Sequence, residues 1–136
     1  MATKRILKLT NNEAIVKVDG AVGSVTIDLA ADLKAAWETI SGTPAVNILV
    51  LQCSGKTDSV ISVARNSVNL WDLQANAAQG INLLEVGACA DNVLNTYNID
   101  VTIAGAEGQL ILKLHKIAGY QTTIRPEQTG SETPVV

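Results

Sequence analysis

The sequence contains few aromatic, cysteine, histidine and proline residues. Among its 136 residues there are no Phe, two Trp, two Tyr, two Cys, one His and three Pro. A core without Phe must take its volume from Val, Ile, Leu and Ala, and the β-branched members of that set favour strands. A chain of this length forms one domain that buries about two-thirds of the surface exposed by its unfolded form, so it needs neither a metal nor a disulfide to fold.

Charged residues are also few and nearly balanced. The sequence has ten Lys and Arg residues and 13 Asp and Glu residues, and neither sign forms a long block. A nucleic-acid-binding protein would show a basic patch with stacking aromatics, and the small cluster of Lys4, Arg5 and Lys8 does not supply one. No run of 18 apolar residues occurs, and no apolar segment follows the first charges. We therefore expect no nucleic acid and no membrane among the partners, and synthesis in a cytosol.

Spacings typical of catalytic, metal and nucleotide sites are missing. His115 is the only histidine, and Cys53 and Cys89 form no CxxC pattern that would support a zinc site. The segment Ser54–Thr57 resembles the end of a phosphate-binding loop, but Val50 stands where the first glycine of that motif belongs. We expect no enzyme activity, no cofactor and no metal, and we interpret both cysteines as reduced packing residues.

The strongest pattern that is present is a hairpin between Asp58 and Leu73. Two runs of alternating apolar residues flank the polar residues Arg65-Asn66-Ser67. This pattern predicts a strand, a tight turn and a second strand, and Asn suits the turn because it tolerates positive φ. Trp71 on the second strand is expected to pack in the core or at its rim, and the alternative is that it anchors a partner, as Trp often does at interfaces.

Several further strands are predicted from period-two alternation. They cover Arg5–Leu9, Ala14–Val18, Val25–Leu29, Val46–Cys53, Ile81–Val86, Ile99–Ile103 and Leu110–Leu114. The first three are expected to form a β-meander, with turns at Asn11-Asn12 and Asp19-Gly20. The run Val46–Cys53 is apolar enough to be buried on both faces or along most of its length.

The segment Ala30–Ile40 leaves two alternatives. Leu33, Ala36, Trp37 and Ile40 recur at helical spacing, and Ser41-Gly42 would end a helix. The other interpretation is an irregular crossover that places Trp37 at the open end of a sheet.

About eight short strands separated by turns indicate an all-β fold, an antiparallel β-sandwich that is jelly-roll-like or Ig-like, with at most one short helix. We assign residues 1–120 to this domain. Beyond Tyr120 the sequence has no usable periodicity and contains two of the three prolines, so residues 121–136 are expected to form an extended C-terminal arm.

Three segments carry a resemblance to a known group of proteins. They read VNILVLQCSG from Val46, VISVARNSVNLWDL from Val60, and NIDVTIAGAEGQLILKLHKIAGY from Asn98. Together they resemble small β-sandwich virion structural proteins of tailed bacteriophages, of the marine and cyanophage type. In that group a V-N-I strand precedes a strand with R-N or R-D at its turn, and the domain closes on L-x-L-x-K-x-x-G-Y. This chain has Ser67 where a glycine would fit the turn better, and its tail beyond Tyr120 is an addition to the pattern.

The resemblance implies a non-enzymatic virion component located on the capsid surface. It would be a capsid decoration or cement protein that binds the major capsid protein shell and copies of itself as a trimer, with the arm or the N-terminal strand reaching onto neighbours. The alternatives are a head-tail connector, tail or fibre-associated protein and, more remotely, a carbohydrate-binding module. The residues expected at the protein interface are Trp71, Arg65, Asn66, Ile124, Arg125 and Val135.

Overall fold

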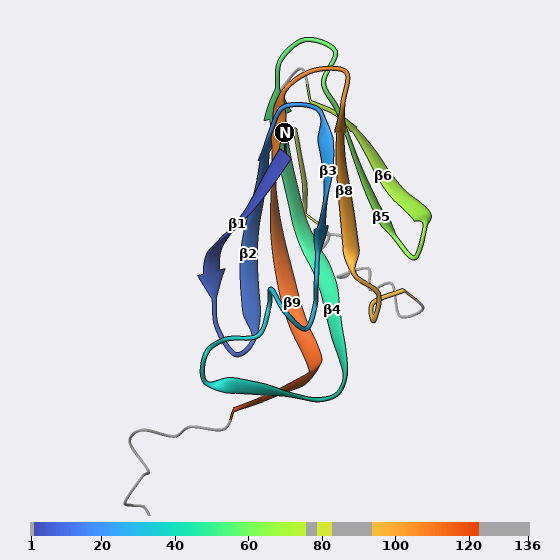
Figure 1. Cartoon of the computed structure of the whole chain (residues 1–136). Helices are drawn as coiled ribbons and strands as arrows, with labels where there is room; N and C mark the ends of the chain where they lie inside the picture. Colours follow the sequence, from blue (N-terminus) through green and yellow to red (C-terminus); the bar gives the residue numbers. More distant parts are fainter. Residues whose placement is uncertain (1, 76–78, 83–93, 123–136) are drawn as a thin grey trace, which may run out of the picture.

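The computed structural model describes residues 2–75, 79–82 and 94–122. Within them every regular element is a strand, and the strands form two antiparallel sheets that pack as a β-sandwich, as predicted (Figure 1). The strands are β1 (Ala2–Leu9), β2 (Glu13–Gly20), β3 (Gly23–Ile27), β4 (Glu38–Gly55), β5 (Val60–Arg65), β6 (Val68–Gln74), β7 (Gln79–Asn82), β8 (Ile99–Ala104) and β9 (Gly108–Thr122). The first sheet has the order β1-β2-β9-β4-β7, and the second has the order β3-β8-β5-β6.

The predicted central hairpin is confirmed as β5 and β6. Arg65 pairs with Val68, so the loop between them holds only Asn66 and Ser67. Both loop residues have positive φ, 51° and 63°, which is the geometry of the type I′ turn that matches the twist of paired strands. Ser67 adopts this conformation without being a glycine, which is uncommon for a residue with a Cβ.

The predicted N-terminal β-meander is wrong. β1 pairs with β2 as expected, but the other edge of β2 pairs with β9, from Glu13 opposite His115 to Gly20 opposite Gly108. β3 crosses to the second sheet and pairs with β8. The pair Asp19-Gly20 forms the end of β2, and the turn follows it. The alternation of apolar residues fixes which face of a strand is buried, but it does not fix which strand lies beside it.

The segment before β4 contains turns in place of the helix, so the irregular crossover is the correct alternative. The carboxylate of Asp28 accepts hydrogen bonds from the backbone N–H groups of Ala30 and Ala31 at 2.9 and 3.0 Å, and the carboxylate of Asp32 accepts one from the N–H of Asp28 at 2.8 Å. Such side-chain bonds compete with helical ones and favour turns. The buried Leu33 reaches the core from this crossover.

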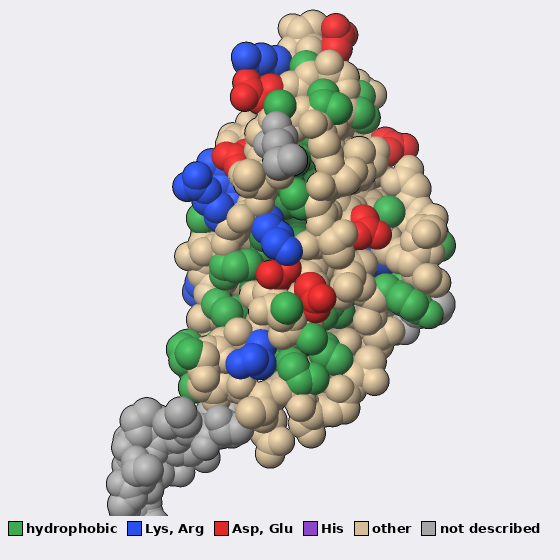
Figure 2. Space-filling view, viewed as in Figure 1, with side chains coloured by type: hydrophobic (Ala, Val, Ile, Leu, Met, Phe, Trp, Pro, Cys, Tyr) green, Lys and Arg blue, Asp and Glu red, His purple; other side chains and the backbone are tan. Residues whose placement is uncertain are grey.

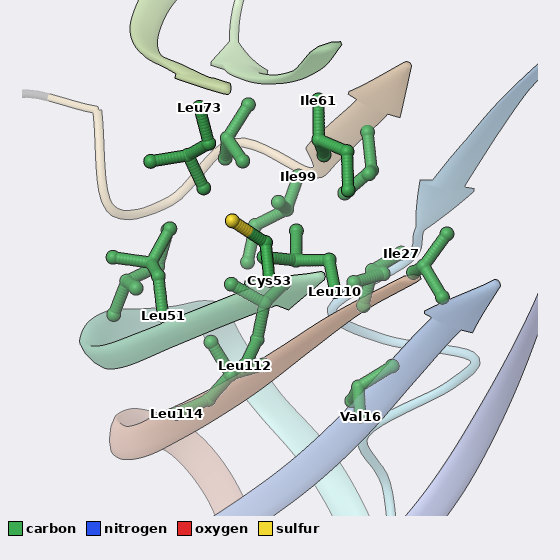
Figure 3. Packing of buried hydrophobic residues seen from close by; sticks show 14 of the residues in the cluster. Val16, Ile27, Leu51, Cys53, Ile61, Leu73, Ile99, Leu110, Leu112 and Leu114 are labelled. Atoms are coloured by element: carbon green, nitrogen blue, oxygen red, sulfur yellow. The ribbon is translucent and has the colours of Figure 1, made fainter. Parts of the chain in front are cut away.

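The core between the sheets is almost entirely aliphatic. Figure 3 shows inward side chains of the first sheet meeting those of the second. The first sheet contributes Val16, Leu51, Cys53, Leu110, Leu112 and Leu114, and the second contributes Ile61, Leu73 and Ile99, with Ile27 at the end of β3. Cys53 is buried among them, as expected, whereas Cys89 lies outside the described residues. Within Val46–Cys53 every second residue or so is buried, three residues are half-buried and only Gln52 is exposed, so the run is partly buried and not buried on both faces.

The last strand extends beyond the predicted end of the domain. Gln121 and Thr122 belong to β9 and pair with Thr39 and Glu38 of β4. The rest of the expected arm, residues 123–136, lies outside the described residues, as do residues 83–86 of the predicted strand Ile81–Val86, whose first two residues form the end of β7.

Candidate functional site

Arg65 does not lie on an exposed turn, and the expectation that it forms part of a surface is corrected. Its side chain is only 1% exposed. The guanidinium group donates hydrogen bonds to the carbonyl oxygens of Val46 at 2.7 Å, Asn95 at 2.9 Å and Tyr97 at 2.9 Å. Arg65 follows the buried residues Ile61 and Val63 at a spacing of two, so the alternation already indicated an inward side chain. The surface position was expected only because a charged side chain is usually exposed to solvent.

The tip of the same hairpin does lie at the surface. Asn66, Ser67 and Val68 are exposed, and Val68 is 47% exposed despite its apolar side chain. Trp71 is half-buried and packs against the core, which agrees with the packing role. Of the expected interface residues, Asn66 is therefore accessible and Trp71 partly so, whereas Ile124, Arg125 and Val135 lie outside the described residues.

A second buried charge was missed at the sequence level. Lys116 of β9 and Glu38 at the start of β4 form an ion pair with their side chains 0% and 1% exposed. The ammonium group also donates to the carbonyl oxygen of Thr10, and the carboxylate accepts the N–H of Ala35 at 2.9 Å. Lys116 follows Leu112 and Leu114 at period two, which is the signal that could have placed it inside. Glu38 gave no such signal because it stood in a segment with helical spacing.

The closing motif of β9 is built around this ion pair. The ring of Tyr120 lies 4.3 Å from the ammonium group of Lys116, an arrangement that favours the cation, and its hydroxyl donates to the carbonyl of Leu29 at 2.6 Å. Burial, reinforced by the nearby carboxylate of Glu38, raises the pKa of the Tyr120 phenol well above its ordinary value of 10.0. Gly119 has a φ of +88°, and a Cβ there would lie 2.4 Å from the Cα of Pro44. Tyr120, through Leu29, and Lys116, through Glu38, attach the crossover to the first sheet, and Gly119 allows β9 to approach Pro44 of β4.

An open hollow of about 300 Å³ lies at one end of the first sheet. Its floor is a row of paired glycines, Gly20, Gly108 and Gly55, on adjacent strands. At its rim Lys56 pairs with Glu107 at 3.0 Å, in the turn that begins after Ser54-Gly55. The chain here is a strand end followed by a turn, in agreement with the turn interpretation of this segment and not with a strand-to-helix phosphate loop.

Several titratable side chains outside these sites lie on the outer face of the first sheet. Glu13 lies between Lys8 and Lys113, at 3.1 and 3.4 Å, and these hydrogen-bonded cations lower the pKa of its carboxyl group. His115 is exposed on β9, opposite Glu13 and Asn47. In the part of the chain that the structure describes, no group of three or more His, Cys, Asp or Glu side chains is arranged to hold a metal ion.

Comparison with known proteins gives no relative from which a role could be transferred. No family model, no curated protein and no solved structure matches the chain. Across residues 2–75, 79–82 and 94–122, no helix is long and apolar enough to cross a membrane.

Proposed function

We propose that the chain is a non-enzymatic structural protein of a tailed-bacteriophage virion, a decoration or cement protein that binds the major capsid protein shell together with copies of itself. The observation that carries this proposal is the meeting of the three resembling segments at one buried junction. The guanidinium group of Arg65, from the R-N turn, donates to the carbonyl of Val46, from the V-N-I strand. Val46 in turn pairs with Lys116, from the closing motif of β9.

This junction supports the proposal because it links the two layers of the sandwich by buried hydrogen bonds as well as by apolar packing. Arg65 belongs to the second sheet, and Val46 and Lys116 belong to the first. Buried polar groups with satisfied partners restrict a sandwich to one arrangement of its sheets. A protein that covers a symmetric shell must present the same surface in every copy, so that many weak contacts act together.

The first test is the copy number of the chain in purified particles of the phage that encodes it, measured by quantitative mass spectrometry against the major capsid protein. A decoration protein is expected at a ratio of one to one, or one to a small integer. A few dozen copies or fewer would reject the shell-covering role and favour the neck, tail or fibres. Absence from the particles would reject a virion role altogether.

The second test concerns the C-terminal segment. We expect that removing residues 123–136 weakens binding to undecorated shells, because the segment is proposed to reach neighbouring subunits. The free energy of unfolding of the shortened chain serves as the control, because every strand of the described residues ends by Thr122. Unchanged binding by a shortened chain of normal stability would contradict a role for this segment.

A further inference from the structure

The outer face of the first sheet carries more positive than negative charge. Side chains alternate along β2 and β9, so the neighbours of the buried Val16, Val18, Leu112 and Leu114 point outward. The outward positions, together with their partners on β1, place four cations, Arg5, Lys8, Lys17 and Lys113, beside two carboxylates, Glu13 and Asp19. Figure 2 shows Lys and Arg side chains along the part of the molecule where β1 lies, with Asp and Glu side chains among them.

One pair on this face is unfavourable within the isolated chain. Arg5 on β1 lies directly opposite Lys17 on β2, and like charges opposite each other destabilise a strand pair. Lys17 has Asp19 at 3.4 Å, but no carboxylate of the described residues forms an ion pair with Arg5. A negative group brought from outside would relieve this repulsion.

The outer face of the second sheet has the opposite character. The only cation in its four strands is Arg65, which points into the core. Its two carboxylates are Asp100, which accepts a hydrogen bond from Thr26 at 2.8 Å, and Asp72, which accepts bonds from Ser62 at 2.7 Å and Asn69 at 2.9 Å. No Lys or Arg of the described chain pairs with either.

This second face is also accessible. The side chains around the two carboxylates are small, and several are exposed: Ser24, Thr26, Asn69, Thr102 and Ala104. Ser24 and Thr102 bond each other across β3 and β8 at 3.0 Å. A sheet face of short side chains lets another sheet face approach closely, and its carboxylates are then within reach of long Lys and Arg side chains.

We propose that these two faces bind each other between copies of this chain, with the basic face of the first sheet on the acidic face of the second sheet of the next copy. The two patches differ, so the contact is heterologous and produces a closed ring or an open stack. Complementary charge gives such a contact its orientation and speed of association more than its strength, so each contact is weak and sensitive to salt. This inference does not rest on the virion role.

The first measurement is the molar mass of the full chain by sedimentation velocity over a range of concentrations. We expect assembly beyond the monomer as concentration rises, and a loss of at least about tenfold in association constant between about 25 and about 500 mM NaCl. A chain that stays monomeric at every concentration in low salt would overturn the proposal.

Two variants reverse the charge of one face each. Arg5→Glu/Lys113→Glu makes the basic face acidic, and it places a carboxylate opposite Lys17. Asp72→Lys/Asp100→Lys makes the acidic face basic. Each variant alone is expected to be monomeric, because its two faces then carry the same sign. An equimolar mixture is expected to associate again, since every acidic face of one variant can meet a basic face of the other.

Failure of the mixture to associate, with both variants folded, would overturn the proposal. Asp72→Asn/Asp100→Asn guards against a folding defect, because the amide oxygens retain the hydrogen bonds from Ser62 and Thr26, and only the exposed bond from Asn69 is lost. This neutral variant is expected to lose association while keeping the stability of the original chain. The control is Lys56→Glu/Glu107→Lys, which exchanges an ion pair at the end of the sandwich, outside both faces. It should associate normally, and loss of association in this variant as well would contradict the assignment to the two faces.

Discussion

The ammonium group of Lys116 and the carboxylate of Glu38 form an ion pair of 2.5 Å between two strands of the first sheet, across 78 positions of sequence, with both side chains withdrawn from water. Such a pair adds little stability compared with two apolar side chains of similar size, because both charges lose their hydration. The pair matters more for what happens when one of its two charges is removed. In the folded chain, removing one charge leaves the other buried without a partner, and this lowers the free energy of unfolding.

The first prediction concerns the removal of one charge from this buried pair. Lys116→Met and Glu38→Gln are each expected to lower the free energy of unfolding by about 3–5 kcal/mol, because each leaves a buried charge without its partner. The double variant Lys116→Met/Glu38→Gln is expected to lose less stability than the sum of the two single changes. Urea unfolding of all three variants measures the coupling. Additive losses would show that the two groups do not act as a pair.

The second prediction concerns the shape of the cation at position 65. Arg65→Lys keeps the charge, but an ammonium group on a flexible stem cannot reproduce a planar donor set directed at the carbonyls of Val46, Asn95 and Tyr97. We expect a loss of at least about 2 kcal/mol in the free energy of unfolding. Arg5→Lys, the same change at an exposed position, is the control and should change it little. Equal effects at both positions would contradict the role of the buried guanidinium group.

The third prediction separates backbone strain from steric overlap. Gly119 and Gly42 both have positive φ, but a Cβ at Gly119 would overlap Pro44, whereas a Cβ at Gly42 would meet no atom within 4 Å. Gly42→Ala should therefore cost about 1–2 kcal/mol from strain alone, and Gly119→Ala about 3 kcal/mol or more. Thermal and urea unfolding measure both. Similar costs at the two positions would show that the approach of β4 to β9 relaxes without penalty.

The fourth prediction is a pH dependence that originates at Glu13. Its pKa in the folded chain is lowered from the ordinary value of 4.5 by Lys8 and Lys113, so its ion pairs stabilise the fold above that pH. This contribution is lost as the pH falls below 4.5 and through the lowered pKa. The stability difference between the original chain and Glu13→Gln should thus be constant near neutral pH and shrink in acid. Glu107→Gln, at an exposed ion pair, is the control. A difference that does not vary between pH 7 and pH 3 would contradict this assignment.

The sequence predicted the strands better than their partners. The alternation in Val60–Arg65, Ile99–Ala104 and the first part of β9 fixes both strand and buried face, because one side of each strand meets the core. The partner of β3 could not be predicted in this way, since either sheet would have buried the same side chains. The crossover before β4 was ambiguous because bonds from the carboxylates of Asp28 and Asp32 to the backbone override helical spacing.

The candidate sites were harder to predict than the fold because their charges are buried. At Arg65 and Lys116 the alternation indicated an inward side chain, while the residue type indicated the surface. Only the pairing of distant segments decides between the two, since the carbonyl of Val46 and the carboxylate of Glu38 must be present to receive each cation. A single sequence does not show those pairings.

The strand order also has a consequence for synthesis on the ribosome. In the first sheet, β9 separates β1-β2 from β4-β7, and in the second sheet β8 separates β3 from β5-β6. The strands that join the halves of each layer are therefore the last to emerge. Until residues 99–122 have left the exit tunnel, the nascent chain can form hairpins but neither complete layer. The fold is then completed in one late step that depends on contacts between residues far apart in sequence, the kind of contact that slows folding.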